Sequence, residues 1–225
     1  LNIMRQSKLY TKTRKEAPKD EVSKNAILLT RAGYIHKEMA GVYTMLPLGL
    51  RVLTKIESIV RRHMDEIGNE LLMTALSPKE TWERTGRLDS IDVLMKTTPA
   101  NKVSEEKSSA SYILGSTHEE MITPIAQEYS RSYKDLPSAF YQIQTKFRNE
   151  ARAKSGLLRG REFRMKDLYS FHKDADDLNH YYDDAKKVYM SIFSEIGIGE
   201  DTFITLASGG DFTKDFSHEF QTLCD

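Results

Sequence analysis

The chain has 225 residues, of which 39% are hydrophobic and 29% charged, and its 33 basic side chains balance 33 acidic ones. This composition is typical of a soluble globular protein, and zero net charge excludes a generally basic protein that coats nucleic acid. The single Cys224 excludes an internal disulfide and fits a reducing, cytoplasmic setting, while no apolar run approaches the roughly 20 residues that span a bilayer.

The first half of the chain predicts an arm, two helices and two strands. Residues 1–19 are polar and basic and predict an N-terminal arm. Residues 20–39 carry apolar side chains at helical spacing, whereas residues 41–49 (GVYTMLPLG) predict a strand that Pro and Gly interrupt. A strongly amphipathic helix is expected at residues 50–67, followed by a buried strand at residues 70–76 (ELLMTAL).

The second half predicts a loop, a hairpin and two more helices. Residues 101–111 (NKVSEEKSSAS) predict an exposed loop, and residues 111–133 predict a short strand, a turn and a helix. Two strand patterns at residues 140–147 and 162–171 flank a basic loop, and residues 174–197 predict a long helix with an acidic first turn.

Strands that meet in hairpins between long helices indicate an α+β domain with a largely antiparallel sheet. The last strand candidates are residues 201–206 (DTFITL) and 216–225, on either side of a turn-rich loop. No strand is followed by GxGxxG or a Walker loop, which excludes the usual Rossmann and P-loop nucleotide sites.

The basic hairpin is the most unusual feature. Between Lys146 and Lys166 there are eight Lys or Arg residues and only two acidic residues, Glu150 and Glu162. Arginine matches phosphate oxygens two at a time, and residues two apart on a strand, such as Arg148 and Glu150, face the same side. The hairpin could therefore hold a triphosphate and an RNA end, although a solvated β-ribbon is the commoner use of such a sequence.

A resemblance to a known family favours the first interpretation. Residues 145–172 (TKFRNEARAKSGLLRGREFRMKDLYSFH) resemble motif 2 of class II aminoacyl-tRNA synthetases, in the form typical of bacterial prolyl-tRNA synthetases. Further pieces resemble the family in its order, and the likeness runs from about residue 19 to the end. These pieces are residues 31–78 (the N-terminal segment with motif 1), ETWERTGR (a linker), GSTHEE (an amino-acid loop) and FSHEFQ (a pocket strand). The resemblance implies ATP-dependent activation of proline and its transfer to tRNA(Pro), with Mg²⁺ bridging the phosphates.

The resemblance also implies roles for the hairpin in ATP binding. Arg148 would contact the α-phosphate and the amino-acid carboxylate, and would be the catalytic residue. Glu150 would bind the adenine amino group, and Phe163 would stack on the adenine ring. Arg159 and Arg161 would reach the triphosphate.

For proline, the resemblance implies Thr117 and Glu119 as partners of the secondary amine, together with Arg148. On the residues alone, Ser116 and Glu119 predict a capping box ahead of an apolar helix, which is the commoner use of this pattern. His218 and Glu219 would line the same pocket, although such residues are more often an ordinary polar pair on an edge strand.

Arg152 and Lys154 would contact the tRNA acceptor end. Met165, Asp167 and Phe171 alternate along the second hairpin strand, so they either border the proline ring or pack in the core. The resemblance implies no protein metal site, and no DNA or membrane partner.

The resemblance divides the chain into an arm and a catalytic core, and it implies a homodimer formed through motif 1. Thr74 stands where the family's motif 1 has proline, and motif 3, the editing domain and the anticodon-binding domain have no counterpart. We therefore expect the N-terminal part of a synthetase, inactive or weak by itself. The expected segments are the arm at 1–19 and the core at 20–225, with motif 1 at about 48–78, the amino-acid loop at 115–120, motif 2 at about 140–172 and the pocket strand at 216–223.

Two alternatives stay open at this point. A class II fold without motif 3 could bind RNA or regulate a partner without catalysis. A serine or threonine enzyme is the other alternative, which THEE and SHEF disfavour, as does the lack of zinc-ligand clusters for a threonine enzyme.

Overall fold

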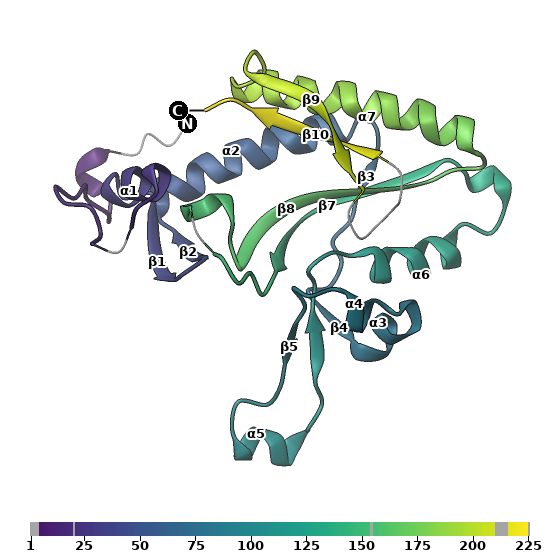
Figure 1. Cartoon of the computed structure of the whole chain (residues 1–225), viewed down its shortest axis with the longest axis horizontal. Coiled ribbons are helices and arrows are strands. Elements are labelled where there is room, and N and C mark those ends of the chain that lie inside the picture. The colour runs from purple at the N-terminus through teal and green to yellow at the C-terminus, as the bar shows by residue number, and fades with distance from the viewer. Residues whose placement is uncertain (1–4, 20, 154, 210–215, 225) are drawn as a thin grey trace. The chain divides into compact units, whose positions relative to one another are not determined.

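The computed structural model describes residues 5–19, 21–153, 155–209 and 216–224 (Figure 1). The chain divides into two compact units, and each is described by itself. Unit 1 comprises Leu1–Lys55, Met73–Met121 and Ile143–Met165, and unit 2 comprises Ile56–Leu72, Ile122–Gln142 and Lys166–Asp225. None of the described helices is both long enough and apolar enough to cross a membrane.

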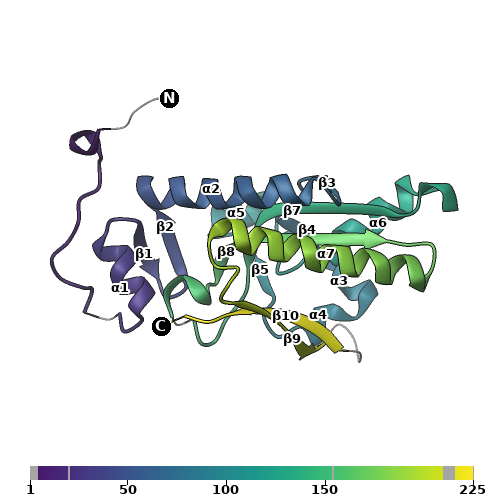
Figure 2. The same cartoon turned by 90° about the horizontal axis from the view of Figure 1, so that it is seen from above.

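Unit 1 begins with a short helix and a hairpin, which lie side by side (Figure 2). After the 3-10 turn Gln6–Lys8, α1 (Lys24–Arg31) is followed by the antiparallel strands β1 (Ile35–Met39) and β2 (Val42–Met45). The helix predicted through residue 39 is wrong beyond Arg31. Gly33 adopts a φ of 75°, which ends the helix and lets Ile35 start a strand instead.

A small antiparallel sheet with the order β4-β6-β5 forms the second part of unit 1 (Figure 1). The exposed loop predicted at residues 101–111 contains a helix, α5, because the Asn101 side chain accepts a hydrogen bond from Ser104 N at 3.0 Å and caps it. The segment is exposed, as predicted, but it is not a loop. The elements here are β4 (Leu76–Pro78), α3 (Lys79–Thr85), α4 (Arg87–Ser90), β5 (Met95–Thr97), α5 (Lys102–Lys107) and β6 (Tyr112–Leu114).

Four longer elements contribute residues to both units. They are α2 (Pro47–Met64), α6 (Glu119–Tyr129), β7 (Ser138–Phe147) and β8 (Glu162–Phe171). β7 and β8 are neighbours in a sheet with the order β3-β7-β8, in which β3 (Asn69–Glu70) runs parallel to β7. Two 3-10 turns, Tyr133–Asp135 and Gly156–Leu158, lie before β7 and inside the hairpin loop.

The single buried strand predicted at residues 70–76 is wrong. The segment splits between β3, which pairs with β7, and β4, which pairs with β6. Leu72, between them, is 74% exposed. An apolar run shows that a segment can be buried, but it does not show that its two ends pair with different strands.

Unit 2 contains the long helix α7 (Ala175–Ile196) and the antiparallel pair β9 (Thr202–Ser208) and β10 (Phe216–Thr222). Asp174 caps α7 by accepting a hydrogen bond from Asp177 N at 2.8 Å. One buried apolar cluster of this unit contains Met64, Tyr141 and Ile192. Helices with mostly antiparallel sheets confirm the predicted α+β class.

Candidate active site

Arg148 lies at the point where the hairpin loop meets the amino-acid loop of residues 115–120. It follows β7 directly, and its backbone N–H donates to Arg161 O at 2.9 Å. Its guanidinium donates from Nε and from Nη2 to Ser116 O, each at 3.3 Å, and lies 5.4 Å from the centre of the Phe163 ring. The structure therefore brings together Arg148, Phe163 and the amino-acid loop, as predicted from the motifs, while their roles stay predictions.

In the amino-acid loop, the side chain of Glu119 does not form the capping box. Glu119 Oε2 accepts hydrogen bonds from the Thr117 hydroxyl and from Arg87 Nη1. Ser116 Oγ is buried and has no hydrogen-bond partner among the described residues. Since neither half of the capping box is present, that alternative is wrong, and the 36%-exposed side chain of Glu119 can meet a ligand.

Arg87 was not predicted as a site residue. Its Nη1 lies 3.3 Å from Glu119 Oε2 and 3.0 Å from Glu120 Oε1, and its Cζ lies 5.9 Å from the centre of the Trp82 ring. Trp82 is fully buried and donates from Nε1 to Ser77 Oγ at 2.8 Å, so it packs inside the protein. The sequence signal was the segment ETWERTGR, whose charged residues gave no indication of their partners.

A buried lysine–histidine pair at the amino-acid loop was also not predicted. Lys146 and His118 are both fully buried, and Lys146 Nζ contacts His118 Nδ1. His118 Nε2 lies 3.1 Å from Thr74 O, which can only accept. Nε2 is therefore assigned the proton, and Nδ1 accepts from Lys146 Nζ. Lys146, one of the eight basic residues of the hairpin, thus contacts the amino-acid loop from the protein interior instead of facing solvent.

Arg161 is engaged with the backbone of the hairpin and of the β1–β2 turn. Its Nε donates to Glu150 O at 3.1 Å and its Nη1 donates to Ala40 O at 3.3 Å. Its backbone N–H donates to Gly41 O at 2.7 Å. These bonds hold the loop in place, so the predicted contact of Arg161 with a triphosphate would be an additional role.

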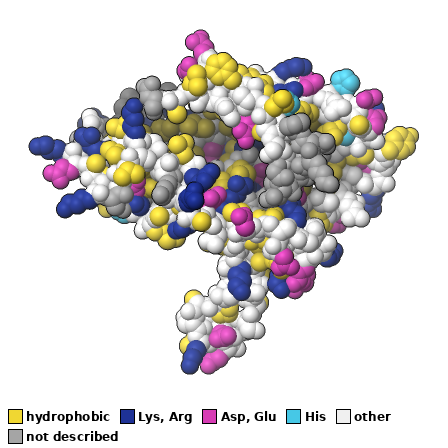
Figure 3. All heavy atoms as spheres, in the orientation of Figure 1, with side chains coloured by type: hydrophobic (Ala, Val, Ile, Leu, Met, Phe, Trp, Pro, Cys, Tyr) yellow, Lys and Arg dark blue, Asp and Glu magenta, His cyan; other side chains and the backbone are white. Residues whose placement is uncertain are grey.

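The remaining hairpin residues differ in exposure. Arg152 and Arg159 are exposed, as residues that meet an RNA or a phosphate tail should be, and Glu150 is half-buried. Lys154 lies outside the described residues. Basic and acidic side chains are interspersed over the face shown in Figure 3. The part of the chain that the structure describes contains no group of three or more His, Cys, Asp or Glu side chains that could hold a metal ion.

The predicted pocket-strand residues His218 and Glu219 lie on β10 in unit 2. The Tyr182 hydroxyl lies 3.1 Å from His218 Nδ1, and Glu219 Oε2 accepts from Gln221 Nε2 at 3.1 Å. Phe220 packs against α7, with its ring 5.4 Å from that of Tyr189. Because Thr117 and Arg148 belong to unit 1, a pocket shared by both sets of residues stays a prediction.

The three alternating residues of β8 do not share one environment. Asp167 Oδ2 accepts from Gln142 Nε2 at 3.0 Å and from the Tyr169 hydroxyl at 2.7 Å, within unit 2. Phe171 lines a cavity of the same unit, and Met165 is half-buried in unit 1. Whether any of the three borders a proline ring stays a prediction.

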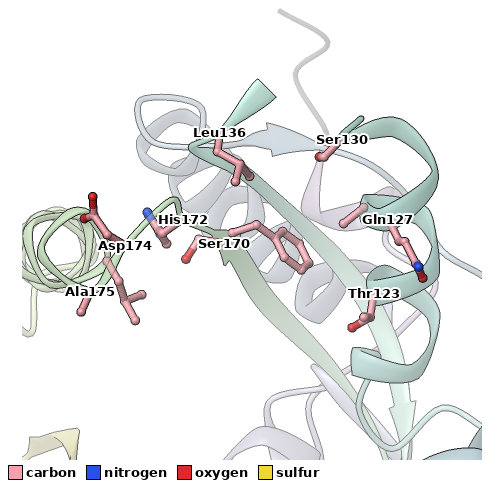
Figure 4. A pocket seen from close by; sticks show the side chains of 11 residues that line it. Thr123, Gln127, Ser130, Leu136, Ser170, His172, Asp174 and Ala175 are labelled. Atoms are coloured by element: carbon pink, nitrogen blue, oxygen red, sulfur yellow. The ribbon is translucent and has the colours of Figure 1, made fainter. Parts of the chain in front are cut away.

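That cavity measures about 650 Å³ and is mainly apolar (Figure 4). His172 lies at its edge, with Nδ1 3.0 Å from Asp177 Oδ2, and the side chain is only 5% exposed. The hydrogen bond from His172 lowers the pKa of Asp177. The sequence did not predict the cavity, because its lining comes from segments that are far apart in the chain. These are α6, Leu136, the end of β8 and the start of α7.

A family model for the tRNA synthetase class II core domain (G, H, P, S and T) matches residues 102–223, which is more than half of the chain. The chain belongs to this class II synthetase family. The match includes the amino-acid loop, the basic hairpin and β10, whereas the motif 1 segment at residues 48–78 lies outside it.

Two curated relatives of this class II synthetase chain are named proline–tRNA ligase. The chain is 47% identical over 215 residues to the protein of Sulfurihydrogenibium sp. (strain YO3AOP1), and the match covers 95% of this chain and 37% of that protein. It is 45% identical over 223 residues to the proline–tRNA ligase of Geobacillus kaustophilus (strain HTA426), with 99% of this chain and 38% of that protein covered. The chain thus spans less than two fifths of the length of these curated relatives.

Solved structures agree with the class II fold. The prolyl-tRNA synthetase of Giardia lamblia in complex with prolyl-adenylate superposes with a TM-score of 0.74 over 85% of this chain and 39% of that one, at 20% sequence identity. The enzyme of Cryptosporidium parvum complexed with L-proline and AMP gives a TM-score of 0.70 over 85% of this chain and 38% of that one, at 16% identity. At these identities the likeness shows the fold alone.

Proposed function

We propose that the protein is a proline–tRNA ligase, which activates proline with ATP and transfers it to the 3′ end of tRNA(Pro). The observation that carries the proposal is identity of 45–47% with proteins of that name over 95–99% of the chain. The juxtaposition of Arg148, Phe163, Thr117 and Glu119 supports it from the side of the chemistry, because these groups suit a phosphate, a purine ring and an amine.

In the first step, a carboxylate oxygen of proline attacks the α-phosphorus of ATP and pyrophosphate leaves. In the second step, a hydroxyl of the terminal ribose of tRNA attacks the carbonyl carbon and AMP leaves. Arg148 would neutralise the charge that builds on the α-phosphate oxygens. Its bonds to Ser116 O and its position over Phe163 hold it in place beforehand, which is the preorganised arrangement that contributes most to catalysis.

The other predicted residues take the roles that follow from their chemistry. Glu119 would pair with the secondary ammonium of proline, with Thr117, His218 and Glu219 as further proline contacts. ATP would bind Glu150 and Phe163, with its phosphates near Arg159 and Arg161, and it would bring Mg²⁺ bound to those phosphates. The exposed Arg152, with Lys154, would contact the tRNA acceptor end.

The proposal extends to assembly and location. We propose a homodimer formed through the motif 1 segment, residues 48–78, whose exposed apolar side chains include Leu50, Leu72 and Leu76. The hydroxyl of Thr74 donates to Leu76 O at 2.8 Å, a local bond that proline at this position could not make. We place the protein in the cytoplasm, with neither DNA nor a membrane as a partner.

The test is proline-dependent exchange of labelled pyrophosphate into ATP by the protein in its natural length, with alanine and serine as control substrates. Arg148→Ala should lower the exchange rate at least about 100-fold, which corresponds to the roughly 3 kcal/mol of one preorganised donor. Arg84→Ala is the matched control, because Arg84 is an exposed arginine of α3 outside the proposed site.

Exchange that stays normal in Arg148→Ala would refute the role of Arg148. Absence of exchange with any amino acid, combined with salt-sensitive binding of tRNA, would instead identify a class II RNA-binding module.

A further inference from the structure

We propose that Arg87 is the positioning residue of the amino-acid site, because it fixes the carboxylate of Glu119 for a cationic amine. The inference rests on the proposed function and adds a residue to it. Arg87 follows Gly86 directly and begins α4, outside both the amino-acid loop and the hairpin.

Arg87 forms ion pairs with two carboxylates, those of Glu119 and Glu120. One nitrogen, Nη1, lies 3.3 Å from Glu119 Oε2 and 3.0 Å from Glu120 Oε1. The side chain of Glu120 is completely buried, and its Oε1 also accepts from the Thr85 hydroxyl at 3.3 Å. The guanidinium lies near the Trp82 ring, which has no solvent exposure, so it is backed by a rigid surface.

These contacts engage one carboxylate oxygen of Glu119 and leave the other available to a ligand. Oε2 is held by Arg87 and by the Thr117 hydroxyl, whereas Oε1 has no hydrogen bond within the part of the chain that the structure describes. Two bonds to the same oxygen restrict the rotation of the carboxylate, so Oε1 is presented in a fixed direction. A carboxylate held in this way binds an ammonium without first losing conformational freedom.

The charge of the cluster fits one cation. Glu119 and Glu120 carry two formal negative charges and Arg87 carries one positive charge. A secondary ammonium would neutralise the charge that remains. Without Arg87, the buried carboxylate of Glu120 would lose its ion pair beside a second carboxylate, which is the costly arrangement for buried charges.

Arginine is required at this position for a geometric reason. A planar guanidinium can stack on Trp82 and contact two acceptors, whereas an ammonium is a point charge without a face to stack. We therefore expect Arg87→Lys to keep the charge and to restore only part of the function that Arg87→Met loses.

The experiment measures proline-dependent pyrophosphate exchange in the protein of natural length, with KM for proline, KM for ATP and kcat determined separately. Arg87→Met should raise KM for proline about 10- to 100-fold, because a misplaced carboxylate binds the amine less well, while KM for ATP stays within about twofold. Arg87→Lys should give an intermediate KM for proline. Arg84→Met, at an exposed arginine of the neighbouring helix α3, should match the wild type.

A variant that also removes Glu120 keeps the test decisive if Arg87→Met fails to fold. Arg87→Met/Glu120→Gln deletes both charges of the buried ion pair, so folding no longer requires the arginine, and thermal unfolding verifies this. A raised KM for proline in the folded double variant supports the positioning role. An unchanged KM for proline, or equal rises for proline and ATP, overturns it. A wild type without proline-dependent exchange would refute the proposed function itself.

Discussion

Two lysines of the basic hairpin are buried or partly buried, although a charged residue is normally solvated. Lys146 has no solvent exposure, and Lys166 on β8 is partly buried against Tyr189, with Nζ 4.1 Å from the ring centre. Desolvation lowers the pKa of Lys166 from 10.5 to about 8, although Asp167 opposes the shift. Burial also raises the pKa of Tyr189 to about 12. Lys166 therefore costs stability at neutral pH instead of contributing to it.

Replacing Lys166 should show this cost directly. Below pH 8 the native state must hold a desolvated charge, which costs at most roughly 3 kcal/mol. Between pH 8 and 10.5 the unfolded chain binds more protons, so stability rises with pH across this window. Ionisation of unfolded tyrosines reverses the trend above pH 10. Urea unfolding should show that Lys166→Met is more stable than the wild type by about 1–3 kcal/mol at pH 7 and that the difference shrinks by pH 9.5.

The control for this prediction is Lys187→Met on α7. The Lys187 side chain is 76% exposed and pairs with Asp184 at the surface, so its replacement should change stability little at any pH. Wild-type and Lys166→Met stabilities that run parallel from pH 7 to 9.5 would contradict the assigned pKa.

At the scale of elements, local signals predicted most of the fold. Helix α7 begins at the Asp174 cap and ends before Gly197, and the sequence carried both signals. The helix at residues 20–39 was overextended because Ile35 continues the helical spacing, although Gly33 had already ended the helix. The prediction of a single strand at residues 70–76 was wrong for a different reason, since strand pairing depends on distant partners and not on the segment itself.

The site residues divide in the same way: a local motif identified some of them, and only the folded structure identified the others. Arg148, Phe163 and Thr117 were found because their types and order resemble a known motif. Arg87 and Lys146 were not, because only the fold shows that one bridges two carboxylates and that the other is buried beside His118. A charged residue in a polar sequence is normally solvated, so its burial cannot be inferred from its type.

The β1–β2 turn supports the hairpin loop through a close backbone approach at Gly41. A Cβ atom at Gly41 would lie 2.7 Å from Ala153 Cβ and 2.9 Å from Arg161 N, and its φ is 77°. Gly197, at the end of α7, also has a positive φ of 93°, but a Cβ atom there would meet nothing within 4 Å. The two positions thus share the backbone strain and differ in the steric clash.

We therefore expect Gly41→Ala and Gly197→Ala to differ in their effect on ATP binding. Both should lose about 1 kcal/mol of stability, because alanine disfavours a positive φ. Gly41→Ala should also displace the loop that carries Arg161, and raise KM for ATP in pyrophosphate exchange at least about fivefold, since misplaced binding groups lose affinity. An equal KM for ATP in the two variants would show that the turn does not support an ATP site.

At the scale of the whole molecule, the balance of charge decides how RNA can bind. The chain has 33 basic and 33 acidic residues, and both kinds are interspersed on the face shown in Figure 3. A protein without net charge gains no general attraction to a polyanion, so its affinity for RNA must come from a few local contacts. Such contacts release counterions, and the dependence of affinity on salt counts them.

The salt dependence of tRNA binding should therefore identify the basic residues of the hairpin that contact RNA. Replacing both Arg152 and Lys154, the two residues proposed to meet the acceptor end, by alanine removes about two phosphate contacts, so the slope of log K against log salt should become less negative by about 1.5. The control is Lys102→Ala/Lys107→Ala, which removes two exposed positive charges from α5 without touching the hairpin. Its slope should equal that of the wild type. If both double variants change the slope equally, the RNA responds to total charge, and the hairpin is not the site where the acceptor end binds.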